Sequence, residues 1–211
     1  MAEKTSGNMK VFEKIGDSTL KLEYDILKKI NQEEEREKSE FHLFPKVMNY
    51  REEDTRGILT MEYIDGITLQ NIPRAKKVQW MMWMEEVARG MVLLHKLRPA
   101  VIWCDCKPEN LMIDREYRIH LIDFDGSCYQ LKQSPNRIYG TRAYAAPEQK
   151  TGGILDERTD IYGFGATFLK LLPAWKYVTI RKLLRKCVEP QKEKRFQTAS
   201  ELLYELKQIR R

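Results

Sequence analysis

The chain has 211 residues, of which 42% are hydrophobic and 32% are charged. This length suits one domain, or one domain in two lobes, and the balance argues against a disordered chain or a membrane protein. The formal charge of +6 is spread along the chain. It is compatible with an acidic ligand or substrate and argues against nucleic acid as a partner.

Cysteine usage and the first residues indicate the compartment. The four cysteines show neither paired CxxC spacing nor a disulfide framework, and the three histidines are scattered, so we expect no zinc site. The opening residues lack the apolar core of a signal peptide, and the longest apolar run is too short to span a bilayer. We therefore expect a reduced, cytoplasmic protein without a membrane partner.

The first half of the chain alternates between strand and helix patterns. In chain order we predict a strand at 9–12, a helix at 19–30, two strands at 46–50 and 57–64, and a long helix at 78–97. One face of the long helix carries apolar residues at helical spacing: Met84, Val87, Ala88, Met91 and Leu94. Because such a stripe is typical of a buried face, we interpret it as core.

A short loop, "VIWCDCKPENLMID", follows the long helix and carries Asp105, Lys107 and Asn110. The strands predicted at 111–114 and 118–123 form a hairpin, which places Asn110 at its entrance and Asp123 at its exit. An amide and a carboxylate in this arrangement suit magnesium, and a neighbouring lysine suits a phosphorylated nucleotide. On these residues alone, a charged surface turn and an ordinary hairpin with solvated ends remain open.

An ordered set of motifs then resolves the choice. "DCKPEN" and "IDFDG" are followed by "GTRAYAAPE" at 140–148 and by "DERTDIYGFG", which contains Asp160. This set resembles the motifs of eukaryotic-type (Hanks-type) serine/threonine protein kinases over residues 9–211. The resemblance implies an α+β, bilobal kinase-like fold with a truncated N-lobe sheet and a mainly helical C-lobe. It divides one kinase domain into an N-lobe and hinge at 1–64 and a C-lobe at 65–211.

The resemblance also assigns the chemistry to residues of the loop. Asp105 would accept or orient the proton of the substrate hydroxyl, and Lys107 would neutralise charge on the transferred phosphoryl group. Asn110 and Asp123 would hold Mg²⁺, with ATP as the phosphoryl donor and a protein as the substrate. Lys107 and Thr141 match the serine/threonine type rather than the tyrosine type.

Nucleotide contacts are implied further upstream. Lys10 resembles the strand lysine that binds nucleotide phosphates, and Glu23 resembles the helix glutamate that pairs with it. Lys4 and Lys14 remain rivals of Lys10, and an ordinary surface lysine remains open for that position.

The strand at 57–64 resembles the one that leads into the adenine-binding hinge. Met61 would guard the back of the pocket, backbone groups of Glu62 and Ile64 would bond the base, and Met112 would form the floor. Plain core packing of the two methionines is compatible with this role, because an adenine slot is lined by apolar side chains.

Three further residues resemble positions that stabilise the fold of protein kinases. Asp160 resembles the buried helix aspartate that braces the catalytic loop, with a helix N-cap as the alternative. Glu148 and Arg195 resemble the ion pair that anchors the end of the activation segment. Small-molecule phosphotransferases of related fold generally lack that segment.

The chain also departs from the family. Trp103 and Cys104 replace the usual His-Arg before Asp105, so we expect no switch by activation-loop phosphate, and Ser134 is a weak candidate for one. Asp125 replaces the glycine of Asp-Phe-Gly and could bind metal or hinder closure. The region after the helix predicted at 160–172 is short, so a substrate-docking helix is expected to be missing or reduced.

The sequence contains no GxGxxG before residue 9. We therefore expect the ATP phosphates to lie uncovered on one side and the affinity for ATP to be weak. We also expect an exposed strand edge near 9–12, which a second copy of the chain or another partner would cover.

Three functions remain: an active minimal serine/threonine protein kinase, an inactive kinase-fold scaffold, and a kinase of a non-protein substrate. The first is favoured, because a scaffold has no physical need to keep Asp105, Lys107, Asn110 and Asp123 together.

Overall fold

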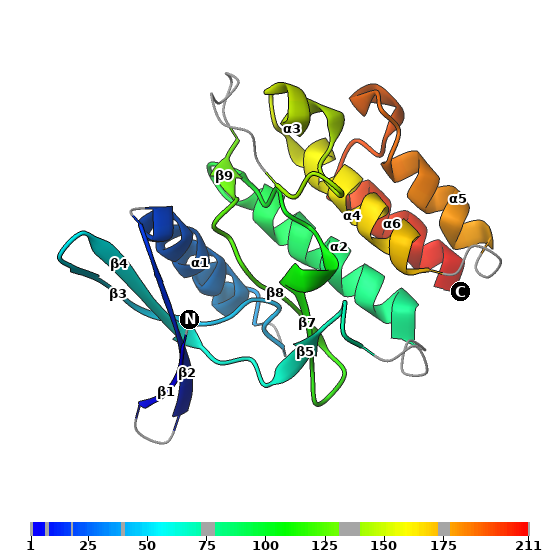
Figure 1. Ribbon diagram of the computed structural model, residues 1–211. Helices are drawn as coiled ribbons and strands as arrows, with labels where there is room; N and C mark the ends of the chain where they lie inside the picture. Colours follow the sequence, from blue (N-terminus) through cyan, green and yellow to red (C-terminus); the bar gives the residue numbers. More distant parts are fainter. Residues whose placement is uncertain are drawn as a thin grey trace.

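Strands dominate the first third of the chain and helices the remainder (Figure 1). A computed structural model describes residues 2–6, 9–17, 19–38, 41–72, 79–130, 140–172 and 178–210. The strands are Ala2–Ser6 (β1), Met9–Gly16 (β2), Val47–Glu53 (β3), Arg56–Glu62 (β4), Gly66–Thr68 (β5), Val101–Ile102 (β6), Leu111–Asp114 (β7), Ile119–Leu121 (β8) and Cys128–Tyr129 (β9). The helices are Thr19–Arg36 (α1), Trp80–Lys96 (α2), Pro147–Thr151 (α3), Glu157–Leu171 (α4), Val178–Cys187 (α5) and Ala199–Arg210 (α6).

The N-terminal part is an antiparallel sheet in the order β1-β2-β4-β3, with α1 packed beside it. The predicted strand at 9–12 is longer than expected and continues to Gly16, because Val11–Gly16 pairs with Gly57–Glu62 of β4. Our expectation that the edge at 9–12 needs a second copy or a partner is wrong. Residues 2–6 of the same chain pair with 9–13 and cover that edge. The polar "AEKTS" has no apolar alternation, so the sequence pattern did not reveal this strand.

Helix α1 forms where apolar residues recur at helical spacing, and Leu20, Leu27 and Ile30 are buried. The helix extends six residues beyond the predicted end, into the acidic run. Within that run the Glu34 carboxylate is buried and accepts a hydrogen bond of 2.7 Å from the backbone N–H of Leu43. This contact fastens the connection from α1 to β3.

Helix α2 forms the centre of the C-terminal part. The predicted apolar face is confirmed, since Met84, Val87, Ala88, Met91 and Leu94 are fully buried. This helix packs against α4, α6 and β8 (Figure 1). By the transfer free energy of apolar surface, each methionine, valine or leucine side chain of this face contributes about 1.5–3 kcal/mol when buried.

Two small sheets pack beside this helical part, through β8 and β6. Strands β5, β7 and β8 form one sheet, and β6 pairs with β9 in the other. The predicted hairpin is present as β7 and β8, so residues 103–110 form a loop between β6 and β7. Together with the N-terminal sheet and the mainly helical C-terminal part, these sheets confirm the expected α+β class. Within the described residues, no helix combines the length and apolar character needed to span a bilayer.

Candidate functional site

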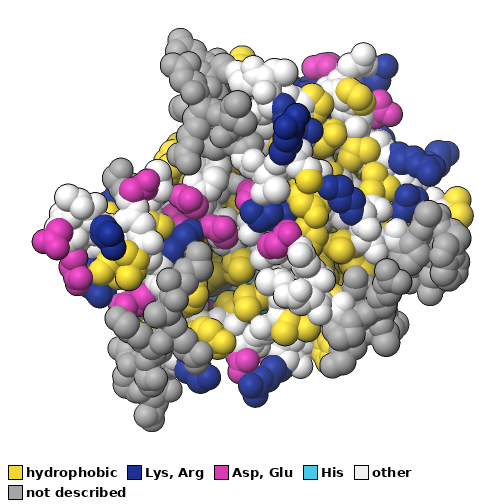
Figure 2. Space-filling model, in the orientation of Figure 1, with side chains coloured by type: hydrophobic (Ala, Val, Ile, Leu, Met, Phe, Trp, Pro, Cys, Tyr) yellow, Lys and Arg dark blue, Asp and Glu magenta, His cyan; other side chains and the backbone are white. Residues whose placement is uncertain are grey.

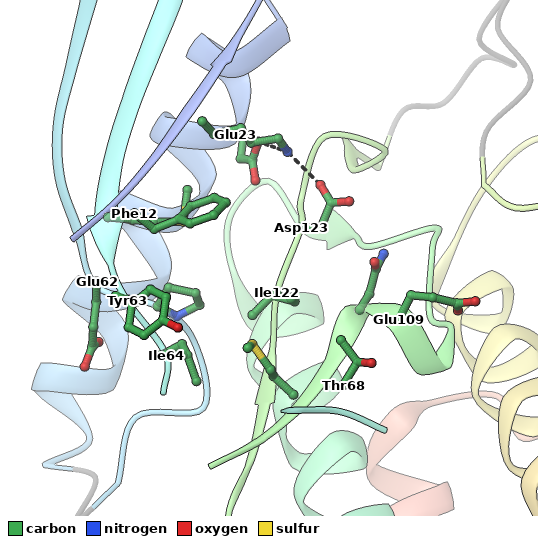
Figure 3. Close-up of a pocket in the computed structure, with 14 residues that line it drawn as sticks. Phe12, Glu23, Glu62, Tyr63, Ile64, Thr68, Glu109, Ile122 and Asp123 are labelled. Carbon is green, nitrogen blue, oxygen red and sulfur yellow. Dashed lines mark hydrogen bonds and ion pairs between the residues drawn. The ribbon is translucent and has the colours of Figure 1, made fainter. Parts of the chain in front are cut away.

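Lys14 lies between two carboxylates that come from distant parts of the chain. Its Nζ is 2.8 Å from Glu23 Oε2 on α1 and 2.7 Å from Asp123 Oδ1, which follows β8. Figure 3 shows Glu23 and Asp123 joined through these contacts at one end of the cavity. The three side chains therefore connect the sheet, helix α1 and the segment after the hairpin.

The expected pairing of Lys10 with Glu23 is wrong, because Lys14 makes it. Alternation along β2 places positions 10, 12 and 14 on the same face, so the pattern could not distinguish them. Lys10 lies four residues before Lys14, and its Nζ is 5.4 Å from the centre of the Tyr63 ring. The position of the lysine beside α1 is set by the register of β2 on β4, in which Lys14 pairs with Leu59.

Burial and neighbouring charges both shift the pKa values of Lys14 and Glu23. Burial alone would lower the pKa of Lys14, but the Glu23 and Asp123 carboxylates outweigh it and raise that pKa. Burial raises the pKa of Glu23, while the ammonium group of Lys14 and the N–H of Phe124 oppose the rise. The ionised form of Glu23 therefore depends on Lys14.

Asp105 is held by three donors in the loop between β6 and β7. Its Oδ2 accepts hydrogen bonds from Lys107 Nζ at 2.6 Å and from Asn110 Nδ2 at 3.1 Å. Its Oδ1 accepts one of 2.8 Å from the N–H of Thr141. An ionised carboxylate has about four acceptor positions, so Asp105 is oriented but keeps capacity for one further donor.

Lys107 also donates a hydrogen bond of 3.0 Å to the hydroxyl of Thr141. The segment around Thr141 and the loop that carries Asp105 therefore form one hydrogen-bond network. Gly140 makes this approach feasible. Its φ is +82°, and a Cβ there would lie 2.5 Å from the carbonyl oxygen of Cys104. Only glycine tolerates both conditions without strain.

Asp160 of α4 holds the start of the loop through its carboxylate. Its two carboxylate oxygens accept hydrogen bonds from the N–H groups of Trp103 at 2.9 Å and Cys104 at 2.7 Å. The cap of α4 is Asp156, so the alternative of an N-cap role for Asp160 is excluded. Cys104 and Asp123 have φ of +67° and +63°. Such backbone conformations are uncommon outside glycine and occur where the surroundings enforce them.

Asn110 and Asp123 have the donor set for a divalent metal ion. The Nδ2 of Asn110 is engaged by Asp105, so its amide oxygen is the atom that can serve as a ligand. The Asp123 side chain is 40% exposed and has a second oxygen besides the one bound to Lys14. Among the described residues, no three His, Cys, Asp or Glu side chains form a metal cluster. The residues present fit Mg²⁺, which takes few protein oxygens and completes its shell with phosphate and water.

A cavity of about 260 Å³ lies next to these groups, between the N-terminal sheet and the hairpin. Figure 3 shows Phe12 and Ile122 facing it from opposite sides. The predicted hinge and floor residues all line it: Met61, Glu62, Ile64 and Met112. The backbone N–H of Glu62 is bonded to the carbonyl of Lys46 at 2.8 Å, so the backbone of Glu62 can offer a base only its carbonyl oxygen.

On the face in Figure 2, acidic and basic side chains lie side by side above hydrophobic ones in the central region.

Glu148 and Arg195 form the expected ion pair. Both residues follow the loop at 103–110 by many positions in the sequence. Both guanidinium nitrogens Nη1 and Nη2 bond the carboxylate, at 2.7 and 2.9 Å, and the Arg195 side chain is fully buried. Arg195 also donates to the carbonyls of Glu189, Arg158 and Pro190. The pair fixes helix α3 against the segment before α6.

Comparison with known proteins places these features in a family. The family model of the protein kinase domain matches residues 19–181. The chain belongs to the protein kinase family. The resemblance inferred from the motif set is thereby confirmed.

Curated relatives carry serine/threonine kinase names. The chain is 31% identical, over 79% of its length, to EPD1-interacting receptor-like cytoplasmic serine/threonine-protein kinase 5D of Gossypium barbadense. It is 33% identical, over 60% of its length, to probable serine/threonine-protein kinase PBL11 of Arabidopsis thaliana, and 32% identical over the same share to serine/threonine-protein kinase BIK1 of that plant. It spans 35–37% of the length of these three relatives.

Trp103, which stands where the family usually has histidine, is part of the hydrophobic core. Its ring is fully buried and stacks on Phe124 with ring centres 5.8 Å apart, and its Nε1 donates to the carbonyl of Asp123 at 3.2 Å. Sequence reasoning did not predict this hydrogen bond. It also missed Gln149, whose Nε2 donates to the carbonyl of Cys104 at 2.7 Å. Ser134 lies outside the described residues.

Proposed function

We propose that this kinase domain transfers the γ-phosphate of ATP to a serine or threonine hydroxyl of a protein substrate, with Mg²⁺ as the metal. The single observation that carries the proposal is that two networks converge beside one cavity. Lys14, Glu23 and Asp123 form the first and line the cavity. Asp105, Lys107 and Thr141 form the second, which reaches the cavity through Asn110, a lining residue bonded to Asp105.

Each group has a role that its geometry supports. Asp105 accepts the proton of the substrate hydroxyl, because it is oriented by three donors and retains acceptor capacity. Lys107 and Lys14 bring positive charge to the transferred and the non-transferred phosphates. Phosphoryl transfer depends mainly on positioning and charge stabilisation, which such a fixed arrangement supplies.

The cofactors follow from the same residues. Met61, Ile64 and Met112 offer apolar contact to adenine, while the carbonyl of Glu62 and the backbone of Ile64 offer it hydrogen bonds. Asn110 and Asp123 would hold Mg²⁺, which neutralises phosphate charge when bound.

The compartment and the lobe boundary also remain proposals. We infer a cytoplasmic location. The four free, buried cysteines and the word "cytoplasmic" in the name of one relative support it. A division between an N-lobe at 1–64 and a C-lobe at 65–211 is consistent with the change from sheet to helices along the chain.

The experiment is phosphoryl transfer by Asp123→Ala, with Asp25→Ala as the control. Asp25 lies on α1 and pairs with Lys21 at the surface, at 3.1 Å. We expect Asp123→Ala to lose transfer at every Mg²⁺ concentration while its circular dichroism stays unchanged, and Asp25→Ala to retain it. Normal turnover by Asp123→Ala would contradict the metal assignment.

A catalytically inactive scaffold is the second candidate, because of the replacements at Trp103, Cys104 and Asp125. Binding of Mg·ATP by the unaltered chain without any transfer to protein or to small hydroxyl compounds would favour it. Transfer to a small hydroxyl compound but not to proteins would favour the third candidate, a kinase of a non-protein substrate.

A further inference from the structure

Asp125 stands where the family usually has glycine, two residues after Asp123. The residues with positive φ in the described part of the chain include Asp123 but not Asp125. The backbone at 125 therefore has no need of glycine in this conformation. A side chain at this position can make a contact that glycine cannot.

That contact is with helix α1. The hydroxyl of Thr19, the first residue of the helix, donates a hydrogen bond of 2.7 Å to Oδ1 of Asp125. Hydrogen bonds to an ionised carboxylate are stronger than neutral ones. A negative charge at the first turn of a helix is also favourable, because the helix dipole is positive there.

A second contact lies one turn further along α1. Glu23 Oε1 accepts a hydrogen bond of 3.0 Å from the N–H of Phe124, next to Asp125. Residues four apart lie on the same face of a helix, so Thr19 and Glu23 bind consecutive residues of one segment. Lys29 adds a third contact, 3.2 Å from the hydroxyl of Tyr129. These contacts connect three positions along α1 to residues 124, 125 and 129.

We propose that Asp125 is a positioning residue, which holds α1 through Thr19 so that Glu23 keeps Lys14 beside Asp123. The inference rests on the proposed function, because Lys14 and Asp123 are its phosphate and metal groups. Binding of a metal ion by Asp125 would have to use Oδ2, because Oδ1 is bound to Thr19.

The experiment compares Asp125→Ala, Thr19→Val and the double variant. We expect each single variant to lose about tenfold in kcat/KM for ATP, since a charge-assisted hydrogen bond is removed. The double variant should lose no more than either single variant, because both remove the same bond. Thr19→Ser keeps the hydroxyl and should retain wild-type activity.

Hydrogen exchange provides a readout that does not need activity. In the nucleotide-free chain, amides 20–27 should exchange about tenfold faster in Asp125→Ala and Thr19→Val than in wild type or Thr19→Ser. Two matched controls should leave these amides unchanged: Asp25→Ala on the same helix, and Thr179→Val in the exposed first turn of α5.

Two outcomes would overturn the inference. One is wild-type exchange at 20–27 in both single variants; the other is equal impairment of Thr19→Ser and Thr19→Val. Absence of transfer by the wild-type chain would instead contradict the proposed function, and the exchange measurement would still decide the role of Asp125.

Discussion

At the residue scale, Lys14 is the side chain that joins helix α1 to the segment after β8, and we propose that it binds the nucleotide phosphates. It contacts both Glu23 and Asp123, and burial of Glu23 raises the pKa of that carboxyl, so loss of the ammonium favours its neutral form. Lys10 is exposed and lies near Tyr63 instead. Two lysines on one face of one strand therefore have different expected roles.

We predict that Lys14→Met lowers kcat by about 10²-fold or more, because a positioned charge on the phosphates is lost. Lys10→Met should cost less than about threefold, since exposed charges contribute little. Steady-state kinetics of the two variants check this. Equal losses of kcat in both variants would contradict the assignment of Lys14, rather than Lys10, as the phosphate-binding lysine.

Asp156 gives a pH dependence of stability. Burial alone would raise its pKa, but hydrogen bonds from Arg158 and Lys192 outweigh this and lower the pKa from 3.8 to about 2. Because the folded-state pKa is below the unfolded value, the stabilisation is complete above about pH 4 and is lost as the pH falls towards 2.

We predict that Asp156→Asn lowers the free energy of unfolding by about 1–2 kcal/mol at pH 7, after allowance for solvent screening. Asparagine keeps the helix cap, so the loss reflects the charge. Urea unfolding at several pH values measures the difference from wild type, which should shrink between about pH 4 and pH 2. A difference that stays constant over that interval would count against this origin.

At the element scale, most helices and strands of the site could be predicted from apolar spacing. Strand β1 could not, because "AEKTS" carries no alternation and is recruited by pairing with β2. The choice between Lys10 and Lys14 depends on register, which one strand does not encode. The contact of Thr19 with Asp125 joins residues 106 positions apart, and only the fold brings them together.

Helices α3 and α4 and the segment before α6 depend on the buried Glu148–Arg195 pair. We predict that Arg195→Met lowers the free energy of unfolding by about 3–5 kcal/mol, because the Glu148 carboxylate is left buried without its partner. The control is Arg185→Met, which removes an exposed arginine of α5 and should change stability by less than about 0.5 kcal/mol. Denaturant unfolding of both variants is the measurement. Equal midpoints would show that the pair does not anchor the segment.

At the scale of the whole molecule, the four cysteines report on the integrity of the fold. All are free and buried. Burial raises the pKa of the Cys106 and Cys187 thiols, and a hydrogen bond to Cys128 together with burial raises that of Cys104. A thiol that is both protonated and inaccessible reacts slowly.

We therefore predict that the folded chain resists alkylation by iodoacetamide at pH 8, whereas all four thiols react in denaturant. Mass spectrometry of the two samples provides the count. Rapid labelling of any one cysteine in the native chain would show that its part of the core opens readily.

We propose that the network around Asp105 performs phosphoryl transfer to protein hydroxyl groups. The most direct measurement incubates the chain with Mg²⁺, γ-labelled ATP and a generic basic protein, followed by acid hydrolysis to identify the labelled amino acid. Wild type is compared with Asp105→Asn and with Asp54→Asn, a control in the exposed β3–β4 turn. We predict labelled phosphoserine or phosphothreonine from wild type and Asp54→Asn, and at least about 10²-fold less from Asp105→Asn. Equal labelling by all three chains, or none by wild type at saturating ATP, would contradict the account.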